Sequence, residues 1–134
     1  MTGVNEGFHH VAIKVHDFDA AVKFYTAGLG FNEKLSWGEG EKRAVLLDAG
    51  NGNYVEIFAG GSPGPKPEGS VVHFAFRSTN CDAAIERAQK AGAEVTMQPK
   101  NVEIPSRPHK TPVRIAFCKG PAGEVIEFFQ NELT

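Results

Sequence analysis

Two stretches of the chain combine β-branched and aromatic residues in the alternating manner typical of β-strands. The first, FHHVAIKV, covers residues 8–15, and the second, SVVHFAFR, covers 70–77. An Ala-rich segment with apolar residues at helical spacing follows each of them. This pattern predicts two helices, over 18–28 and 82–91.

Capping residues mark the ends of both predicted helices. Asp17 and Asn80 stand where an N-cap is expected, and their short polar side chains can accept from a free backbone N–H. Gly28 or Gly30 is expected to end the first helix and Gly92 the second. Both helices therefore have sequence-defined limits.

Shorter apolar segments separated by glycine-containing turns follow each helix. We expect three strands after each, at 31–37, 42–48 and 53–58 and then at 94–97, 112–118 and 124–129. Each half of the chain then has the element order β-α-β-β-β. The predicted fold class is α+β, built from two tandem βαβββ modules.

The two halves are copies of one another. His10, Ala12 and Lys14 are matched in kind by His73, Ala75 and Arg77, 63 residues later. The segment GNYVEIF at 52–58 matches GEVIEFF at 123–129, which aligns Glu56 with Glu127. A module of about 60 residues is too small to bury its apolar face alone. We therefore expect one domain over 1–134, with modules at about 8–59 and 70–131.

Two segments lie outside the repeat. Residues 60–69, GGSPGPKPEG, have no periodicity and are predicted to link the modules. Residues 98–112 contain four prolines and several basic groups, and they have no equally long counterpart in the first copy. Because loops added to one repeat are often functional, we expect a lid or pocket rim there.

Strand alternation sorts the repeated polar residues by face. His10 and Lys14 share one face, while Val11, Ile13 and Val15 share the helix-facing one. The same rule puts His73 with Arg77, and Glu56 with Tyr54 and Phe58, of which Phe58 is expected in the core. A carboxylate buried without a partner among such residues costs several kcal/mol, so Glu56 and Glu127 should each have a partner or a metal ion.

His10, Glu56, His73 and Glu127 form a nitrogen and oxygen ligand set. Such a set suits Zn²⁺, Ni²⁺, Co²⁺, Fe²⁺ or Mn²⁺. Each residue taken alone could be an ordinary hydrogen-bonded histidine or an exposed glutamate. Their recurrence at equivalent positions of both copies favours the metal site.

Composition narrows the class of partner. A formal charge of -2 gives no electrostatic reason to expect nucleic acid or an anionic membrane. The start of the chain lacks the charged and apolar regions of a signal peptide, and no stretch is long enough to span a membrane, so we expect a cytoplasmic protein with a small-molecule partner. Cys81 and Cys118 fall in no C-x-x-C pattern and are expected to be free thiols.

The opening HHVAIKVHDFDAAVKFYTAGLGF, together with the paired modules, resembles the vicinal oxygen chelate superfamily. The resemblance implies two modules that form a half-open mixed sheet around one divalent metal ion per site, with His10, Glu56, His73 and Glu127 as ligands. Ni²⁺, Zn²⁺ or Co²⁺ is expected, with Fe²⁺ or Mn²⁺ as alternatives. It also implies a homodimer, with sites either within one chain or shared between two.

Glu56 at the second ligand position makes the chain similar to glyoxalase I, the lactoylglutathione lyase. The implied reaction is a proton transfer next to a carbonyl through a metal-stabilised enediolate, on a small α-oxo compound or its thiol adduct. Glu127 is the first choice of base, with Glu56 as its partner on the opposite side. An acyl-CoA epimerase such as methylmalonyl-CoA epimerase, a dioxygenase and a binding or resistance protein are the alternatives.

Several residues bear on the substrate. Lys14 and Gly60 stand where glyoxalase I has the Arg and Asn that it uses on glutathione, and this difference leaves the substrate open. An anionic substrate is expected from the residues that would line the pocket, namely Lys14, Tyr54, Arg77, Arg107 and Lys110. His9 has Val72 as its counterpart and is expected to pack or hydrogen-bond behind the sheet.

Overall fold

The computed structural model describes residues 8–64 and 71–134. The chain divides into two compact units, Met1–Pro63 (unit 1) and Gly64–Thr134 (unit 2). Each unit has the predicted element order, which confirms the fold class. Within the described ranges, no helix has the length and apolar character that a membrane crossing requires.

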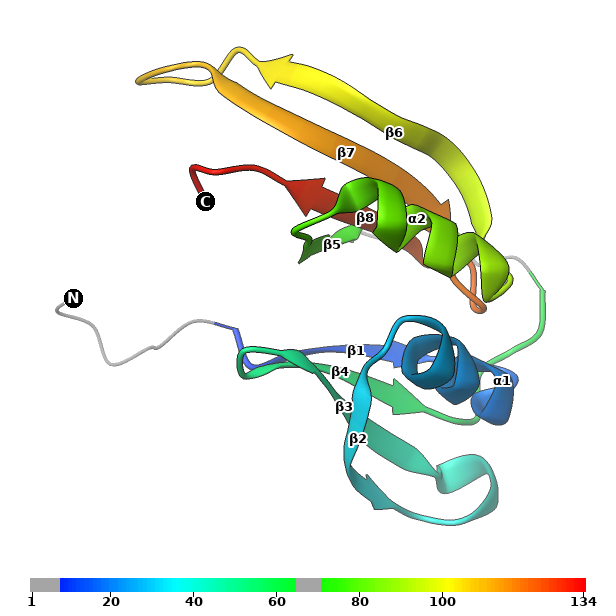
Figure 1. Ribbon diagram of the computed structural model, residues 1–134. Helices are drawn as coiled ribbons and strands as arrows, with labels where there is room; N and C mark the ends of the chain where they lie inside the picture. Colours follow the sequence, from blue (N-terminus) through cyan, green and yellow to red (C-terminus); the bar gives the residue numbers. More distant parts are fainter. Residues whose placement is uncertain (1–7, 65–70) are drawn as a thin grey trace, which may run out of the picture. The chain divides into compact units, whose positions relative to one another are not determined.

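Unit 1 is a four-stranded mixed sheet with one helical segment against it (Figure 1). Its strands are β1 (His10–Lys14), β2 (Asn32–Trp37), β3 (Ala44–Gly50) and β4 (Asn53–Phe58). They are arranged in the order β1-β4-β3-β2, with β1 parallel to β4 and the other pairs antiparallel. The parallel pair places the first and last strands of the unit side by side.

The helical segment of unit 1 begins where the sequence predicts. The side chain of Asp17 caps α1 (Phe18–Lys23) by accepting from the backbone N–H of Ala20 at 3.0 Å. The chain continues as a π-helical turn, η1 (Phe24–Gly28), and leaves it through Gly30 at φ 87°. Between this segment and the sheet lies the core, formed by Val15, Ala21, Phe24, Tyr25, Val45, Leu47, Val55 and Ile57.

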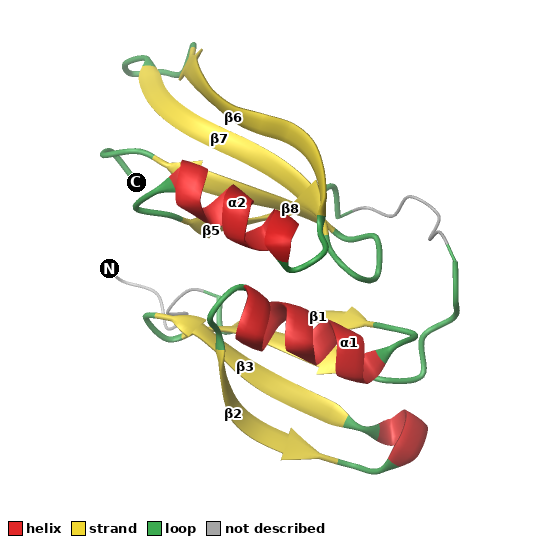
Figure 2. Cartoon of the chain, turned by 45° about the vertical axis from the view of Figure 1, so that its right-hand side comes forward, coloured by secondary structure: helices red, strands yellow, loops and turns green. Residues whose placement is uncertain are grey.

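Unit 2 repeats the topology. Its strands are β5 (Phe74–Arg77), β6 (Glu94–Ile104), β7 (Thr111–Lys119) and β8 (Val125–Gln130), in the order β5-β8-β7-β6. The helix α2 (Cys81–Lys90) lies against one face of this sheet (Figure 2). Asn80 caps it by accepting from the N–H of Ala83 at 3.0 Å, as predicted.

An ion pair joins the sheet of unit 2 to α2. Arg114 donates two hydrogen bonds to Asp82 on α2, at 2.6 and 2.8 Å, and these bonds hold the pKa of Asp82 below its usual value. The two cysteines are free, as expected, and buried. The apolar core of unit 2 comprises Cys81, Ile85, Ala88, Ala116, Cys118, Ile126 and Phe128.

The prediction of a long loop over 98–112 is wrong. β6 runs on to Ile104 and pairs with β7 as far as Thr111, which leaves only residues 105–110 as the turn. Pro99 interrupts the pairing at a register shift between Met97 and Lys100. Because β6 is an edge strand, a proline that donates no hydrogen bond is tolerated there.

Smaller differences concern strand ends. β1 begins at His10 and β5 at Phe74, later than predicted. A 3₁₀ turn, η2 (Gly40–Lys42), delays the start of β3 to Ala44. Half of the predicted linker, residues 65–69, and the first residue of the predicted 70–77 strand lie outside the described residues.

Candidate functional site

In unit 1, a histidine and a glutamate from neighbouring strands come together. His10 Nε2 lies 3.5 Å from Glu56 Oε1. The parallel pairing of β1 with β4 places Ala12 opposite Glu56. His10 precedes Ala12 by two residues on β1 and therefore points to the same face of the sheet. This face is the one opposite the core, because Val55 and Ile57, the neighbours of Glu56, are buried under the helix.

Unit 2 builds the same pair at equivalent positions. His73 Nε2 lies 3.1 Å from Glu127 Oε1, and Ala75 is opposite Glu127 in the parallel pairing of β5 with β8. Glu127 is 7% exposed and is classed as buried, unlike Glu56. Burial raises the pKa of the Glu127 carboxyl above its usual value, and the nearby His73 opposes this effect.

The donor atoms suit a divalent metal ion. Each unit presents one imidazole nitrogen and one carboxylate oxygen on the same sheet face, a combination that borderline transition metals bind. Among the described residues, no group of three or more His, Cys, Asp or Glu side chains is placed so that it could hold a metal ion.

Apolar side chains surround the glutamate of unit 1. The strand register places Leu46 opposite Glu56, and Leu35 and Trp37 follow on β2 across the same face. Leu35 is 57% exposed and Trp37 45% exposed. Phe58, expected in the core, is half-buried on this face, where its ring contacts Trp37 edge-on at 6.4 Å.

The sequence did not predict that Leu35, Trp37 and Leu46 lie beside Glu56, or that the corresponding residue of unit 2 lies beside Glu127. There, Phe117 of β7 lies opposite Glu127, and its ring meets that of His73 edge-on at 5.4 Å. These residues share the face of the glutamates only through strand register. Residue spacing within one strand carries no signal of that register.

The expectation that His9 lies behind the sheet is wrong. His9 precedes β1, so the alternation of a strand does not apply to it. Its Nδ1 lies 3.0 Å from Nδ1 of His10, and its ring stacks on Tyr54 with the centroids 4.8 Å apart. Tyr54 is on the same face as Glu56, so His9 belongs to the surroundings of the His10–Glu56 pair.

The predicted substrate-binding residues divide into two groups. By strand alternation, Lys14 and Tyr54 in unit 1 share the face of His10 and Glu56, and Arg77 in unit 2 shares that of Glu127. Arg107 lies in the turn between β6 and β7, and Lys110 ends that turn and pairs with Glu103 at 3.5 Å.

The turn that carries Arg107 and Lys110 is remote from Glu127. Phe117, the residue opposite Glu127, follows Thr111 by six positions on β7, or about 20 Å of extended strand. Within unit 2, the turn is therefore at the far end of the sheet from the carboxylate. Unit 2 itself does not bring these two basic residues to the pair.

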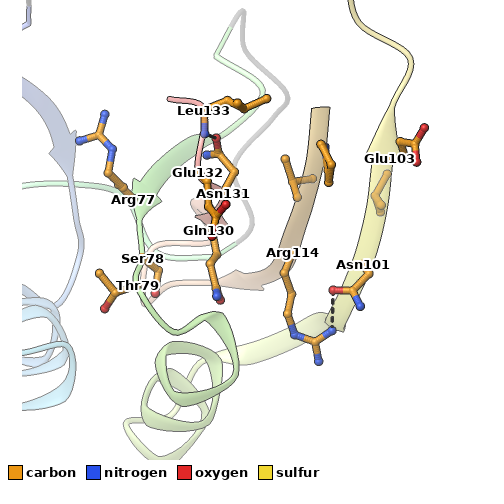
Figure 3. A pocket seen from close by; sticks show the side chains of 13 residues that line it. Arg77, Ser78, Thr79, Asn101, Glu103, Arg114, Gln130, Asn131, Glu132 and Leu133 are labelled. Atoms are coloured by element: carbon orange, nitrogen blue, oxygen red, sulfur yellow. Dashed lines mark hydrogen bonds between the residues drawn. The ribbon is translucent and has the colours of Figure 1, made fainter. Parts of the chain in front are cut away.

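A cavity of about 910 Å³ opens at another edge of unit 2 (Figure 3). Arg77 lines it, whereas His73 and Glu127 do not. Two of its polar side chains have partners within the unit: Arg114 binds Asp82 and Asn101, and Gln130 accepts from the N–H of Cys81 at 2.7 Å. These internal bonds favour a structural role for the cavity wall.

Comparison with known proteins agrees with the duplicated fold. The family model described as Glyoxalase/Bleomycin resistance protein/Dioxygenase superfamily matches residues 7–128. The protein YwbC of Bacillus subtilis is 30% identical over 126 residues, which cover 91% of this chain and 95% of YwbC.

Solved structures with low sequence identity share the fold. The antibiotic binding protein TnmS3 of Streptomyces sp. CB03234 has a TM-score of 0.73 at 22% identity and covers 97% of this chain and 99% of its own. The fosfomycin resistance protein FosX of Listeria monocytogenes has a TM-score of 0.68 at 19% identity and covers 97% of both chains. From the family match and the relative at 30% identity, this chain belongs to the glyoxalase/bleomycin resistance protein/dioxygenase superfamily, also called the vicinal oxygen chelate superfamily.

Proposed function

We propose that the protein is a metal-dependent lyase or isomerase of glyoxalase I type that moves a proton between carbon atoms next to a carbonyl. The observation that carries this proposal is the repeated pair, His10 with Glu56 and His73 with Glu127, at equivalent positions of the two units. A single pair would be an ordinary imidazole–carboxylate contact. Two equivalent pairs make a ligand set.

His10, Glu56, His73 and Glu127 would hold the metal ion, with Ni²⁺, Zn²⁺ or Co²⁺ fitting best and Fe²⁺ or Mn²⁺ as alternatives. A bound divalent ion would polarise neighbouring substrate oxygens and make the adjacent C–H more acidic. The proposal requires the two ligand faces to meet, within one chain or across a homodimer. It treats the modules at about 8–59 and 70–131 as one functional domain.

Glu127 is the proposed base. Its burial raises the pKa of the carboxyl, and a pKa closer to neutral suits a group that takes a proton and returns it. His73, 3.1 Å away, orients the carboxylate. Glu56 is more open and would serve on the opposite side of the substrate.

The proposed substrate is a small α-oxo compound or its thiol adduct. Lys14 and Arg77, on the strand faces of the two glutamates, favour an anionic group. The exposed Leu35 and Trp37 offer an apolar surface beside Glu56. Position 60 is suited to glycine and not to a side chain that binds substrate. Its φ is 84°, and a Cβ atom there would lie 2.9 Å from the carbonyl oxygen of Glu41.

The superfamily contains binding proteins as well as enzymes, so the test must separate binding from turnover. The purified chain, loaded with Ni²⁺, Zn²⁺ or Co²⁺, is assayed on the methylglyoxal–glutathione hemithioacetal and on methylmalonyl-CoA. We expect stoichiometric metal, turnover of the hemithioacetal, and loss of at least 100-fold in kcat for Glu127→Gln.

Three results would contradict this proposal. Turnover of methylmalonyl-CoA alone would support the epimerase instead. A chain that holds no stoichiometric metal would exclude the metal-dependent reaction. Full metal loading without turnover of either compound, in a chain that still binds a small apolar anion, would support a binding protein.

A further inference from the structure

We propose that His9 is a positioning residue that fixes the imidazole of His10 so that its Nε2 faces Glu56. The inference deepens the proposed function, because it assumes that His10 is a ligand at that site. It assigns a role to His9, the residue directly before β1. His9 itself is not one of the four proposed ligands.

The two ring nitrogens of His10 have separate partners. Nδ1 lies 3.0 Å from Nδ1 of His9, and Nε2 lies 3.5 Å from Glu56 Oε1. A hydrogen bond between the two Nδ1 atoms requires one of them to carry a proton and the other to accept it. With either direction of donation, the bond fixes the ring rotation that turns Nε2 towards Glu56.

Metal ligation selects the direction of this bond. An imidazole that gives the lone pair of Nε2 to a metal ion carries its proton on Nδ1. His10 would then donate from Nδ1, and His9 would accept. Ligand histidines in metal sites generally donate this second N–H to a fixed acceptor, and loss of the acceptor weakens metal binding by about 10–100-fold.

His9 is itself held at two points by Tyr54. Their rings stack with centroids 4.8 Å apart and an angle of 30° between the planes. The backbone N–H of Tyr54 donates to the carbonyl oxygen of His9 at 3.0 Å. These contacts let an exposed residue ahead of the strand act as a fixed acceptor.

The second unit orients its histidine differently. Val72 occupies the position equivalent to His9, and its side chain has no hydrogen-bond acceptor. The ring of His73 is instead packed edge-on against Phe117, and its Nε2 lies nearer to its glutamate. A change at His9 should therefore affect the His10 half of the site and leave His73 as it is.

The test uses two substitutions and one control in the full chain. His9→Phe keeps a ring that can stack on Tyr54 but removes the acceptor. His9→Asn restores a polar side chain that can accept. His109→Phe removes an exposed histidine from the turn between β6 and β7 and serves as the control.

Two readouts separate positioning from general stability. The first is nitrogen-15 NMR of the wild-type chain, in which we expect a through-hydrogen-bond coupling between the two Nδ1 nuclei. The second is the Kd for Zn²⁺, measured by competition with a chromophoric chelator. We expect His9→Phe to raise Kd about 10–100-fold, with His9→Asn within about threefold of wild type and the control unchanged.

Absence of the coupling in the wild type overturns the inference, and this readout needs neither metal nor a variant that folds. A Kd unchanged in His9→Phe also overturns it. A wild-type chain that shows the coupling but binds no Zn²⁺, Ni²⁺ or Co²⁺ contradicts the proposed function instead, so the two failures are distinguishable.

Discussion

Glu127 Oε1 lies 3.1 Å from Nε2 of His73, and this carboxylate is the one charged group of the described residues that is classed as buried. Its counterpart, Glu56, has an equivalent partner but keeps more contact with solvent. The two units therefore contain equivalent histidine–glutamate pairs, but Glu56 is more exposed to solvent than Glu127. Burial raises the pKa of the Glu127 carboxyl above its usual value.

The stability of the metal-free chain should depend on pH through Glu127. Its pKa is raised above 4.5 in the folded chain, mainly by burial, so the folded state holds this proton more tightly than the unfolded one. The stabilisation is fully present below the unfolded pKa and is lost as pH rises through the folded pKa. Urea unfolding of wild type and Glu127→Gln across this range measures it.

The wild type should lose free energy of unfolding relative to Glu127→Gln as the pH rises. A difference between the two chains that stays flat, or that has the opposite slope, would contradict the raised pKa. The measurement is made without metal, because a bound ion would replace the proton on the carboxylate.

Substitution of Gly60 by Ala should destabilise unit 1 more than the same substitution at Gly52. Both glycines have positive φ, 84° and 77°, so each alanine carries a strain of about 1–2 kcal/mol. A Cβ at position 60 would also meet the Glu41 carbonyl oxygen at 2.9 Å, whereas one at position 52 meets nothing within 4 Å. Thermal unfolding of both variants gives the comparison, and equal losses would contradict the close contact.

The thiols of Cys81 and Cys118 should be unreactive in the native protein. Burial raises the pKa of Cys118 to about 11 and also raises that of Cys81, so neither forms appreciable thiolate at pH 8. Ellman's reagent should detect no thiol in the native chain and both in denaturant. Rapid labelling of the native protein would show that the core around α2 opens readily.

Loss of the cap of α2 should cost about 1 kcal/mol. Asn80→Ala removes the acceptor for the N–H of Ala83, which then lacks its bond at the start of the helix. Asn80→Asp keeps an acceptor at the same place and is the matched control. Chemical denaturation should show a lower midpoint for the alanine variant alone, and an equal loss in both would assign the effect to another role of Asn80.

The repeat made much of the fold and the two pairs predictable. In a repeat, residues at equivalent positions of the two copies can be aligned. His73 could therefore be recognised from the sequence alone as the counterpart of His10, and Glu127 as the counterpart of Glu56. The helix caps were readable for a similar reason, because a cap depends on residues within one turn.

Features that depend on neighbouring strands could not be predicted in this way. The length of β6 was missed because the four prolines of residues 98–112 suggested a loop, although the polar–apolar alternation of residues 101–104 is a strand signal. Leu35 and Trp37 join the face of Glu56 only through the register of β2 on β3. His9 was misplaced because β1 begins one residue after it, and alternation holds only within a strand.

The register shifts in β2 and β6 bear on whether a strand from another molecule could add to these sheets. Both are edge strands, where a regular row of free N–H and C=O groups would invite a strand from another molecule. Pro99 removes one donor from β6 at its bulge, and β2 is interrupted between Glu33 and Leu35. An incoming strand could not pair with β2 or β6 along its full length, so we expect these irregularities to disfavour strand addition at these two edges.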